Sequence, residues 1–218
     1  MLYAAGRGTR MAPLTDARPK PLVMVAGQPL IDHALSLVHK AGLSRVVANT
    51  HHLPDRLEAH LKDAGVQVIR ETTLLETGGG LRNALPLLGS EPVITLNSDA
   101  VWRGANPITA ARAAWRPDDM DALLVLIPPD RAVGHNGAGD FALDAGGRLT
   151  RAAGLVYSGV QILKTRRLAE IPETVFSLNR LWDMMAASGR LFGVEYSGAW
   201  CDVGQPESIP LAEAMLDV

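Results

Sequence analysis

Apolar residues along the chain recur with two different periods. Short apolar runs rich in β-branched residues predict buried strands, and stretches with apolar residues every three or four positions predict helices. Over Pro29–Ala41, for example, Leu30, Ala34 and Leu37 share one helical face, and Gly42 supplies a C-terminal stop. Strands that alternate with helices in this way predict a parallel sheet joined by crossover helices.

The first two thirds of the chain follow this alternation closely. The predicted strands are Leu2–Ala5, Arg45–Asn49, Val66–Arg70, Val93–Leu96 and Ala122–Ile127. The predicted helices are Pro29–Ala41, Asp55–Ala64, Leu81–Leu88 and Ile108–Trp115. Residues 1–218 are therefore expected to form one α/β domain with a Rossmann-like, mostly parallel central sheet flanked by helices.

From about Asp140 the pattern changes, and predicted strands follow one another without long helices. These strands are Phe141–Leu143, Arg148–Thr150 and Val156–Leu163. The remaining elements are a helix, an extended segment and a closing helix, over Leu178–Ala187, Leu191–Tyr196 and Glu207–Leu216. The C-terminal third is thus expected to add strands to the sheet.

Composition narrows the class of protein. Hydrophobic residues make up 47% of the 218, too many for a disordered chain, and a formal net charge of −2 does not suggest a nucleic-acid-binding surface. A single cysteine, Cys201, rules out an internal disulfide. Without an 18-residue apolar stretch or a visible secretion signal, a cytoplasmic protein with neither a membrane nor a nucleic acid as partner is expected.

A glycine-rich turn follows the first predicted strand. Glycine at Gly6 and Gly8 allows backbone N–H groups to approach phosphate oxygens closely. The turn lacks the Walker lysine pattern, and Met11 stands where a dinucleotide fingerprint needs its third glycine, so an NAD site is disfavoured. A tight turn with no ligand remains the simplest alternative for this segment alone.

Two cations follow this turn closely. They are Arg10 and Lys20, and Lys20 is held between Pro19 and Pro21. Cations placed beside a triphosphate offset the charge that develops during phosphoryl transfer. Together with the glycine-rich turn, this spacing favours phosphate chemistry over a solvated basic loop.

A carboxylate stands at the end of the apolar strand Val93–Leu96. Ligands bind outside the carboxyl ends of strands in open α/β sheets, and Asp99 follows this strand directly. Magnesium prefers oxygen ligands and often takes only one or two protein carboxylates. Asp99 is therefore a candidate Mg²⁺ ligand, although a lone aspartate at such a place more often caps a helix or a turn.

The segment from Leu2 to Ile31 resembles the signature of the sugar-1-phosphate nucleotidylyltransferases. The resemblance implies a Rossmann-like fold and Mg²⁺-dependent transfer of a nucleoside monophosphate from a nucleoside triphosphate to a sugar 1-phosphate, with release of pyrophosphate. Trp200–Gly204 resembles the family's second metal segment, so the resemblance implies that Asp99 and Asp202, 103 residues apart, bind one ion. It assigns catalysis to Arg10 and Lys20. The implied nucleotide-binding residues are Ala4, Ala5, Gly6, Gly8, Thr9, Thr77, Gly78, Gly79 and Asn97.

The sugar side departs from part of the family. The resemblance implies sugar contacts from Gly139, Asp140 and Ser158, but the Glu-Lys-Pro segment of many thymidylyltransferases is missing, and Arg151-Ala152-Ala153 stands in the interval. The Glu-Thr-Gly-Gly-Gly and Gly-Asp-Phe strings and the small size are most similar to the N-acetylmuramate 1-phosphate uridylyltransferases of cell-wall recycling. Residues 1–135 are then expected to form the nucleotide-binding part and 136–218 the part that holds the sugar and the second metal ligand.

Several alternatives stay open at this point. A glucose-1-phosphate-type thymidylyl- or uridylyltransferase would use the same phosphate motifs, because backbone contacts from Gly78 and Gly79 do not distinguish uracil from thymine. A non-catalytic sensor of sugar nucleotides is disfavoured because the loop lysine and both carboxylates are present. His51, His52 and His60 lack partners for a zinc site. Either a monomer or a dimer is compatible with the sequence.

Overall fold

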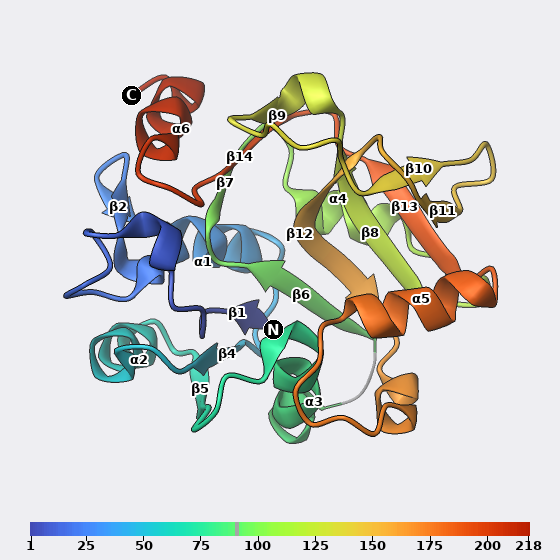
Figure 1. Ribbon diagram of the computed structural model, residues 1–218, viewed down its shortest axis with the longest axis horizontal. Coiled ribbons are helices and arrows are strands. Elements are labelled where there is room, and N and C mark those ends of the chain that lie inside the picture. The colour runs from blue at the N-terminus through green and yellow to red at the C-terminus, as the bar shows by residue number, and fades with distance from the viewer. Residues whose placement is uncertain (90–91) are drawn as a thin grey trace.

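A computed structural model describes residues 1–89 and 92–218. Its centre is a seven-stranded sheet with the order β13-β8-β12-β6-β1-β4-β5 (Figure 1). Every neighbouring pair in it is parallel except the pairs of β12, which runs antiparallel to both β6 and β8. The strands are β1 (Leu2–Tyr3), β4 (Val47–Thr50), β5 (Gln67–Arg70), β6 (Val93–Asn97), β8 (Ala122–Ile127), β12 (Val156–Leu163) and β13 (Leu191–Glu195).

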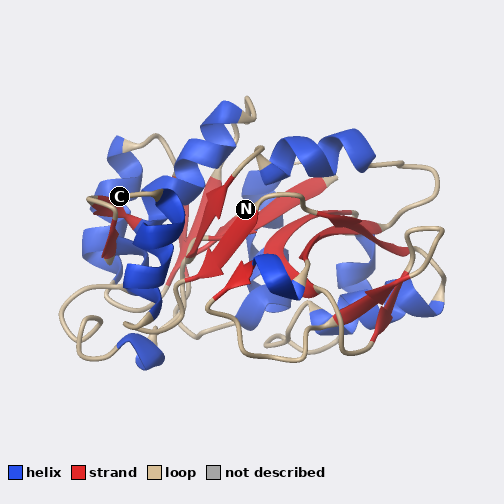
Figure 2. Cartoon of the chain, turned by 90° about the horizontal axis from the view of Figure 1, so that it is seen from above, coloured by secondary structure: helices blue, strands red, loops and turns tan. Residues whose placement is uncertain are grey.

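Helices cover both faces of this sheet (Figure 2). One face packs against α1 (Leu30–Lys40), α2 (Pro54–Asp63) and α4 (Pro107–Ala114), and the other packs against α3 (Glu76–Leu88) and α5 (Asn179–Ala187). Strand β8 shows why both faces need a cover. All six of its side chains are buried. Val125 packs in the core that faces α1, α2 and α4, and Leu124 packs in the core that faces α3 and α5, because successive side chains of a strand point to opposite faces.

A smaller sheet stands beside the first and carries the C-terminal part of the chain. Its order is β7 (Ala100–Arg103), β14 (Ala199–Asp202) and β9 (Ala132–Val133), with β14 antiparallel to β7 and parallel to β9. The last helix, α6 (Ser208–Leu216), packs on it through a third apolar cluster that includes Cys201 and Met215. This sheet fixes β14 against the segment that directly follows β6.

Short elements complete the fold. Two-stranded ribbons pair β2 (Met24–Val25) with β3 (Gln28–Pro29) and β10 (Phe141–Leu143) with β11 (Leu149–Arg151). The 3₁₀ helices are η1 (Thr9–Met11), η2 (Lys20–Leu22), η3 (Pro129–Arg131) and η4 (Arg166–Glu170). Within the described ranges, no helix is both long enough and apolar enough to cross a membrane.

The expected fold class is confirmed, with a mostly parallel central sheet between two helical layers. Several boundaries differ from the predictions. Strand β1 ends at Tyr3 rather than Ala5, because the chain turns there into the glycine-rich loop, and α3 begins at Glu76 rather than Leu81. The three-stranded sheet was not predicted, because its strands are only two to four residues long.

Candidate active site

A cavity of about 380 Å³ opens at the carboxyl ends of β1, β4 and β6. Open α/β sheets bind ligands at this edge, because the loops that leave neighbouring strands diverge there. Its wall contains the predicted Ala4, Ala5 and Gly6. The other lining residues are Tyr3, Lys20, Pro21, Asn49, Leu74, Glu76, Thr77, Asn97, Ser98, Asp99 and Ser177. We call this the larger cavity, to distinguish it from a smaller one of about 240 Å³ that adjoins it.

The glycine-rich loop and the lysine segment pack directly against each other. Gly8 has a φ of +63°, and a Cβ atom on it would lie 2.8 Å from Cβ of Lys20. The carbonyl of Gly8 accepts a hydrogen bond of 3.0 Å from the hydroxyl of Thr15. Glycine is therefore required at this position both for the backbone conformation and for the approach of Lys20.

Lys20 points its ammonium group at the first predicted metal ligand. Its Nζ lies 2.7 Å from Oδ2 of Asp99, and the two side chains are 10% and 32% exposed. The lysine stem is thus enclosed, whereas the carboxylate keeps access to the larger cavity. This pair places a positive charge on the wall of the larger cavity.

The two predicted carboxylates come together across the three-stranded sheet. Asp202 at the end of β14 pairs in register with Ala100 at the start of β7, and the backbone N–H of Val203 donates to the carbonyl of Asp99 over 2.8 Å. Both side chains line a second cavity of about 240 Å³. The fold therefore brings to one place two aspartates that are far apart in sequence.

This smaller cavity shares Asn97 and Asp99 with the larger one, so the two adjoin. Its other lining residues are Arg10, Ala100, His135, Asp140, Val156, Tyr157, Ser158, Trp200 and Asp202. Burial raises the pKa of Asp202, and the nearby charge of Asp99 raises it further, while Lys20, Arg10 and His135 oppose the shift. Such crowding of carboxylates is stabilised by a cation.

A buried hydrogen-bond network fixes one wall of the larger cavity. Asn49, at the end of β4, accepts from the backbone N–H of Ala4 over 2.9 Å and donates to Oε1 of Glu71 over 2.8 Å. The other oxygen of Glu71 accepts from the N–H of Leu75 over 3.0 Å. The buried carboxylate thereby ties the glycine-rich loop to the segment that starts α3.

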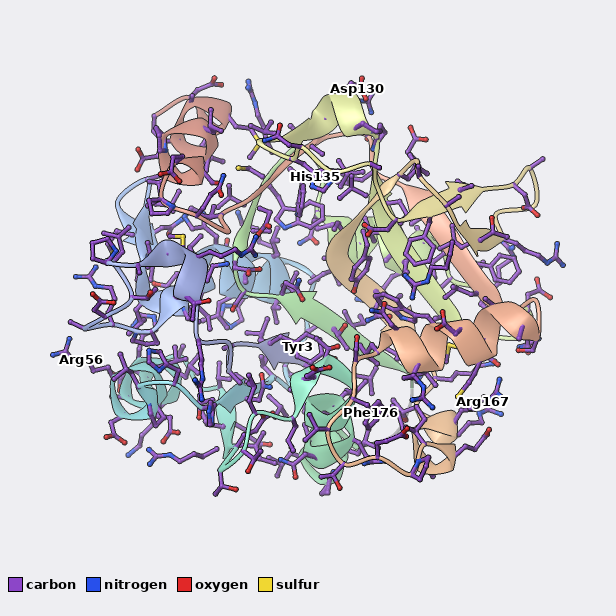
Figure 3. The ribbon with its side chains drawn as sticks, viewed as in Figure 1. Tyr3, Arg56, Asp130, His135, Arg167 and Phe176 are labelled. Carbon is purple, nitrogen blue, oxygen red and sulfur yellow. The ribbon has the colours of Figure 1, made fainter. Side chains whose placement is uncertain are left out.

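The glycines before the predicted helix serve packing rather than the cavity wall. The N–H groups of Gly78 and Gly79 donate to the carbonyl of Phe176, and neither residue lines the larger cavity. A Cβ on Gly78 would lie 2.4 Å from the ring of Phe176, which Figure 3 shows beside α3. Thr77 does line the cavity, and its hydroxyl accepts from the N–H of Leu178.

Of the three predicted sugar-binding residues, two line the smaller cavity and one does not. Asp140 lines the smaller cavity and accepts from the N–H of Tyr157 over 2.8 Å. Ser158 also lines it, but its hydroxyl donates to Val125 and accepts from Val160. Gly139 does not line this cavity. It has a φ of +83° and packs closely against the backbone of Gly154.

The predicted residues Gly8 and Thr9 also lie off the wall of the larger cavity. Gly8 supports Lys20, as described above, and Thr9 lines an outer hollow on the far rim of the loop, together with Arg7, His51 and His52. In the part of the chain that the structure describes, no three or more His, Cys, Asp or Glu side chains gather in a way that could hold a metal ion. A cation here would therefore depend on the aspartate pair and on oxygens from substrates and water.

Several wall residues were not among those predicted from the sequence. Asn49 could have been found, since it ends a predicted strand at the ligand-binding edge of the sheet. The others were not chosen as site residues, although Tyr3, Glu76 and Trp200 belong to segments that the sequence singled out, because only the fold brings them to the two cavities. They are Tyr3, Leu74, Glu76 and Ser177 in the larger cavity, and His135, Tyr157 and Trp200 in the smaller one.

Comparison with known proteins agrees with this geometry. The family model described as "MobA-like NTP transferase domain" matches residues 1–185, so the chain belongs to this family of nucleotidyltransferases. The N-acetylmuramate alpha-1-phosphate uridylyltransferase of Caulobacter vibrioides is 42% identical over 99% of this chain and 96% of its own length. The Neisseria meningitidis protein of the same name is 35% identical over the same shares.

A solved structure shows the same fold. The structure of HddC from Yersinia pseudotuberculosis complexed with GMP-PN superposes with a TM-score of 0.80 and 21% identity, covering 99% of this chain and 97% of HddC. The expected family resemblance and the expected class of enzyme, a nucleotidyltransferase, are thus both confirmed.

Proposed function

We propose that this protein transfers UMP from UTP to N-acetylmuramate 1-phosphate, giving a nucleotide sugar and releasing pyrophosphate. The observation that carries the proposal is the meeting of Arg10, Lys20, Asp99 and Asp202 where the two cavities adjoin. The larger cavity takes the nucleotide, and the smaller one takes the sugar phosphate. Their shared wall is where the two substrates react.

The nucleophile needs no activation by the protein. A phosphomonoester has its second pKa near about 6, so the sugar phosphate is mostly a dianion at neutral pH. One of its oxygens attacks the α-phosphorus of UTP, and the bond from that phosphorus to the bridging oxygen of the β-phosphate breaks. The electron pair leaves with pyrophosphate, and no general base is required.

The protein acts by positioning and by charge. Lys20, held by the packing of Gly8 and by Asp99, neutralises the α-phosphate region and the leaving pyrophosphate. Arg10 lines the smaller cavity and faces the sugar phosphate from the side of Asp202. Both cations are in place before substrate binds, so little reorganisation is needed during the reaction.

Asp99 and Asp202 fit a divalent cation of the Mg²⁺ type. Burial raises the pKa of Asp202, and repulsion from Asp99 raises it further, a cost that a bound cation offsets. Mg²⁺ commonly takes one or two carboxylates and completes its shell with phosphates and water. When bound, it would neutralise charge on the phosphate oxygens of both substrates.

Two observations support this choice of substrates. The relatives from Caulobacter vibrioides and Neisseria meningitidis carry this activity in their names and match the chain almost from end to end. The chain also lacks the Glu-Lys pair of many thymidylyltransferases. Because the substrates are charged metabolites that membranes retain, we place the activity in the cytoplasm and in the recycling of cell-wall peptidoglycan.

The experiment is a matrix of pyrophosphate-release assays with Mg²⁺. UTP, dTTP, CTP, GTP and ATP are each paired with the 1-phosphates of N-acetylmuramate, N-acetylglucosamine, glucose and mannose. Selective turnover of UTP with N-acetylmuramate 1-phosphate is expected. Selective turnover of another pair would contradict the proposed substrates, and nucleotide binding without any turnover would contradict catalysis.

A further inference from the structure

The two cavities meet over the end of one strand. Strand β6 lies between β1 and β12 in the central sheet (Figure 1), and its last residue, Asn97, is paired in register with Tyr3 of β1. On its other side, Asn97 lies against Gly159 of β12. Tyr3 lines the larger cavity, and residues 156–158 of β12 line the smaller one. Asn97 therefore stands on the boundary between the cavities, and it lines both of them.

A glycine in β12 makes room for the side chain of Asn97. Gly159 has a φ of +90° and lies where the pairing of β12 with β8 shifts register, between Tyr157 and Gln161. A Cβ atom on Gly159 would lie 2.7 Å from Cγ and 2.8 Å from Nδ2 of Asn97. The carboxamide thus occupies the volume that the Cβ of any other residue at position 159 would need.

The carboxamide of Asn97 is unpaired and can be reached from the cavities. Among the described residues it has no hydrogen-bond partner. The unpaired side-chain atoms that are fully buried in the described part of the chain belong to Tyr3, Trp102 and His135, and no atom of Asn97 is among them. Its amide therefore keeps some accessible surface. An asparagine side chain offers two N–H donors and an acceptor oxygen, so this group is available to a bound molecule.

A neutral donor suits a place where two anionic substrates meet. Asp99 is the other residue that the described walls of the two cavities share, and it already contributes a negative charge there. An amide N–H can donate to a phosphate oxygen without adding a charge that repels it. Donors that are in place before the reaction stabilise the charge that develops in the transition state. Asn97 is placed to act in this way on phosphate oxygens at the boundary.

We infer that Asn97 is a further catalytic residue, whose Nδ2 donates a hydrogen bond to a phosphate oxygen at the reacting centre, and that Gly159 is the positioning residue that holds it there. This inference rests on the proposed function, in which the α-phosphate and the sugar phosphate meet at the shared wall. The family resemblance implied only that Asn97 contacts the nucleotide. Its amide gains and loses no proton in the reaction and acts through its dipole alone.

The test measures kcat and KM with UTP and N-acetylmuramate 1-phosphate, and calorimetry measures the affinity for UTP. Asn97→Ala removes the amide, whereas Asn97→Asp keeps its volume and removes its donors. Gly159→Ala is made alone and together with Asn97→Ala. Gly147→Ala is the matched control, since Gly147 has a φ of +83° but a Cβ on it would meet no atom closer than 3.7 Å. Circular dichroism checks that the variants are folded.

Both Asn97 variants are expected to lower kcat by roughly a hundredfold or more. For Asn97→Ala, the affinity for UTP should fall much less than kcat does. Near-normal kcat in both variants, or an affinity for UTP that falls as far as kcat/KM, would overturn the catalytic role of Asn97 and leave the proposed function intact. These two variants decide that role whether or not Gly159→Ala folds.

Gly159→Ala should also lower kcat in the wild-type background, whereas Gly147→Ala should keep normal turnover. In the Asn97→Ala background, Gly159→Ala should cost no further turnover, because no amide is left to displace. Equal losses in the two backgrounds would overturn the positioning role of Gly159. A wild type that does not turn over these two substrates would overturn the proposed function, and the inference with it.

Discussion

Nζ of Lys20 lies 2.7 Å from Oδ2 of Asp99, although 79 residues separate them in the chain. The contact joins the segment after the glycine-rich loop to the end of β6, at the wall between the two cavities. In the proposed function, a lysine held in this way meets phosphate oxygens; its partner aspartate remains partly accessible.

Lys20→Ala is expected to lower kcat by roughly a hundredfold or more, because one charge contact in a phosphoryl-transfer transition state is worth about 3 kcal/mol. Nucleotide affinity, measured by calorimetry, should fall much less. The control is Lys62→Ala, an exposed change at the end of α2. If the affinity for nucleotide falls as far as kcat/KM does, Lys20 serves ground-state binding instead.

Asp99→Asn and Asp202→Asn should each reduce turnover by roughly a hundredfold or more at saturating Mg²⁺. Asp63→Asn, at the exposed end of α2, is the control. Pyrophosphate release gives the rate, and near-normal turnover in either variant would rule out the pair as the metal site.

The free energy of unfolding of Asp202→Asn should not fall, although its turnover should. The pKa of Asp202 is raised in the folded protein, so its favourable contribution is present below the unfolded value of 3.8 and is lost as pH rises through the folded value. Above the folded value, the metal-free wild type has lost that contribution, whereas a neutral asparagine does not titrate. Denaturant titration should therefore give Asp202→Asn a free energy of unfolding equal to or above that of the wild type, and a large loss would show that Asp202 has a structural role.

Gly8→Ala should be far more damaging to activity than its backbone strain suggests. Gly8 and Gly65 both have positive φ, +63° and +72°, but a Cβ on Gly65 meets nothing within 4 Å, whereas one on Gly8 meets Lys20. Both alanine variants should lose about 1–2 kcal/mol of stability. Only Gly8→Ala should also lose turnover, because it displaces the lysine. Equal turnover in the two variants would show that Lys20 tolerates displacement.

Cys201 is expected to resist alkylation in the native protein. It is fully buried in the apolar cluster between α6 and the three-stranded sheet, which we call the α6 cluster. Burial raises the pKa of its thiol, and the nearby charge of Asp202 raises it further, to about 11. The stabilising effect of this shift is complete below pH 9.0 and is lost as the pH rises toward 11. Iodoacetamide labelling at pH 8, followed by mass spectrometry, should be slow until denaturant is added. Rapid labelling of the native protein would show that the α6 cluster opens.

Much of this fold was predictable from local pattern, because long periodic segments such as α1 and β8 bury one or both faces. The glycine-rich loop and Lys20 were predictable from chemistry. The start of α3 was not, because glycine disfavours helix and the helical glycines are explained only by tertiary packing, such as that of Phe176 on Gly78. The place of His135 on the wall of the smaller cavity was not predictable either, because that cavity forms between distant segments.

The pairing of β14 with β7 has a consequence for how the two cavities depend on the chain. Asp202 comes 103 residues after Asp99, whereas most of the wall of the larger cavity comes from the first hundred residues. Detachment of β14 from β7 would therefore separate the two aspartates and leave most of that wall in place.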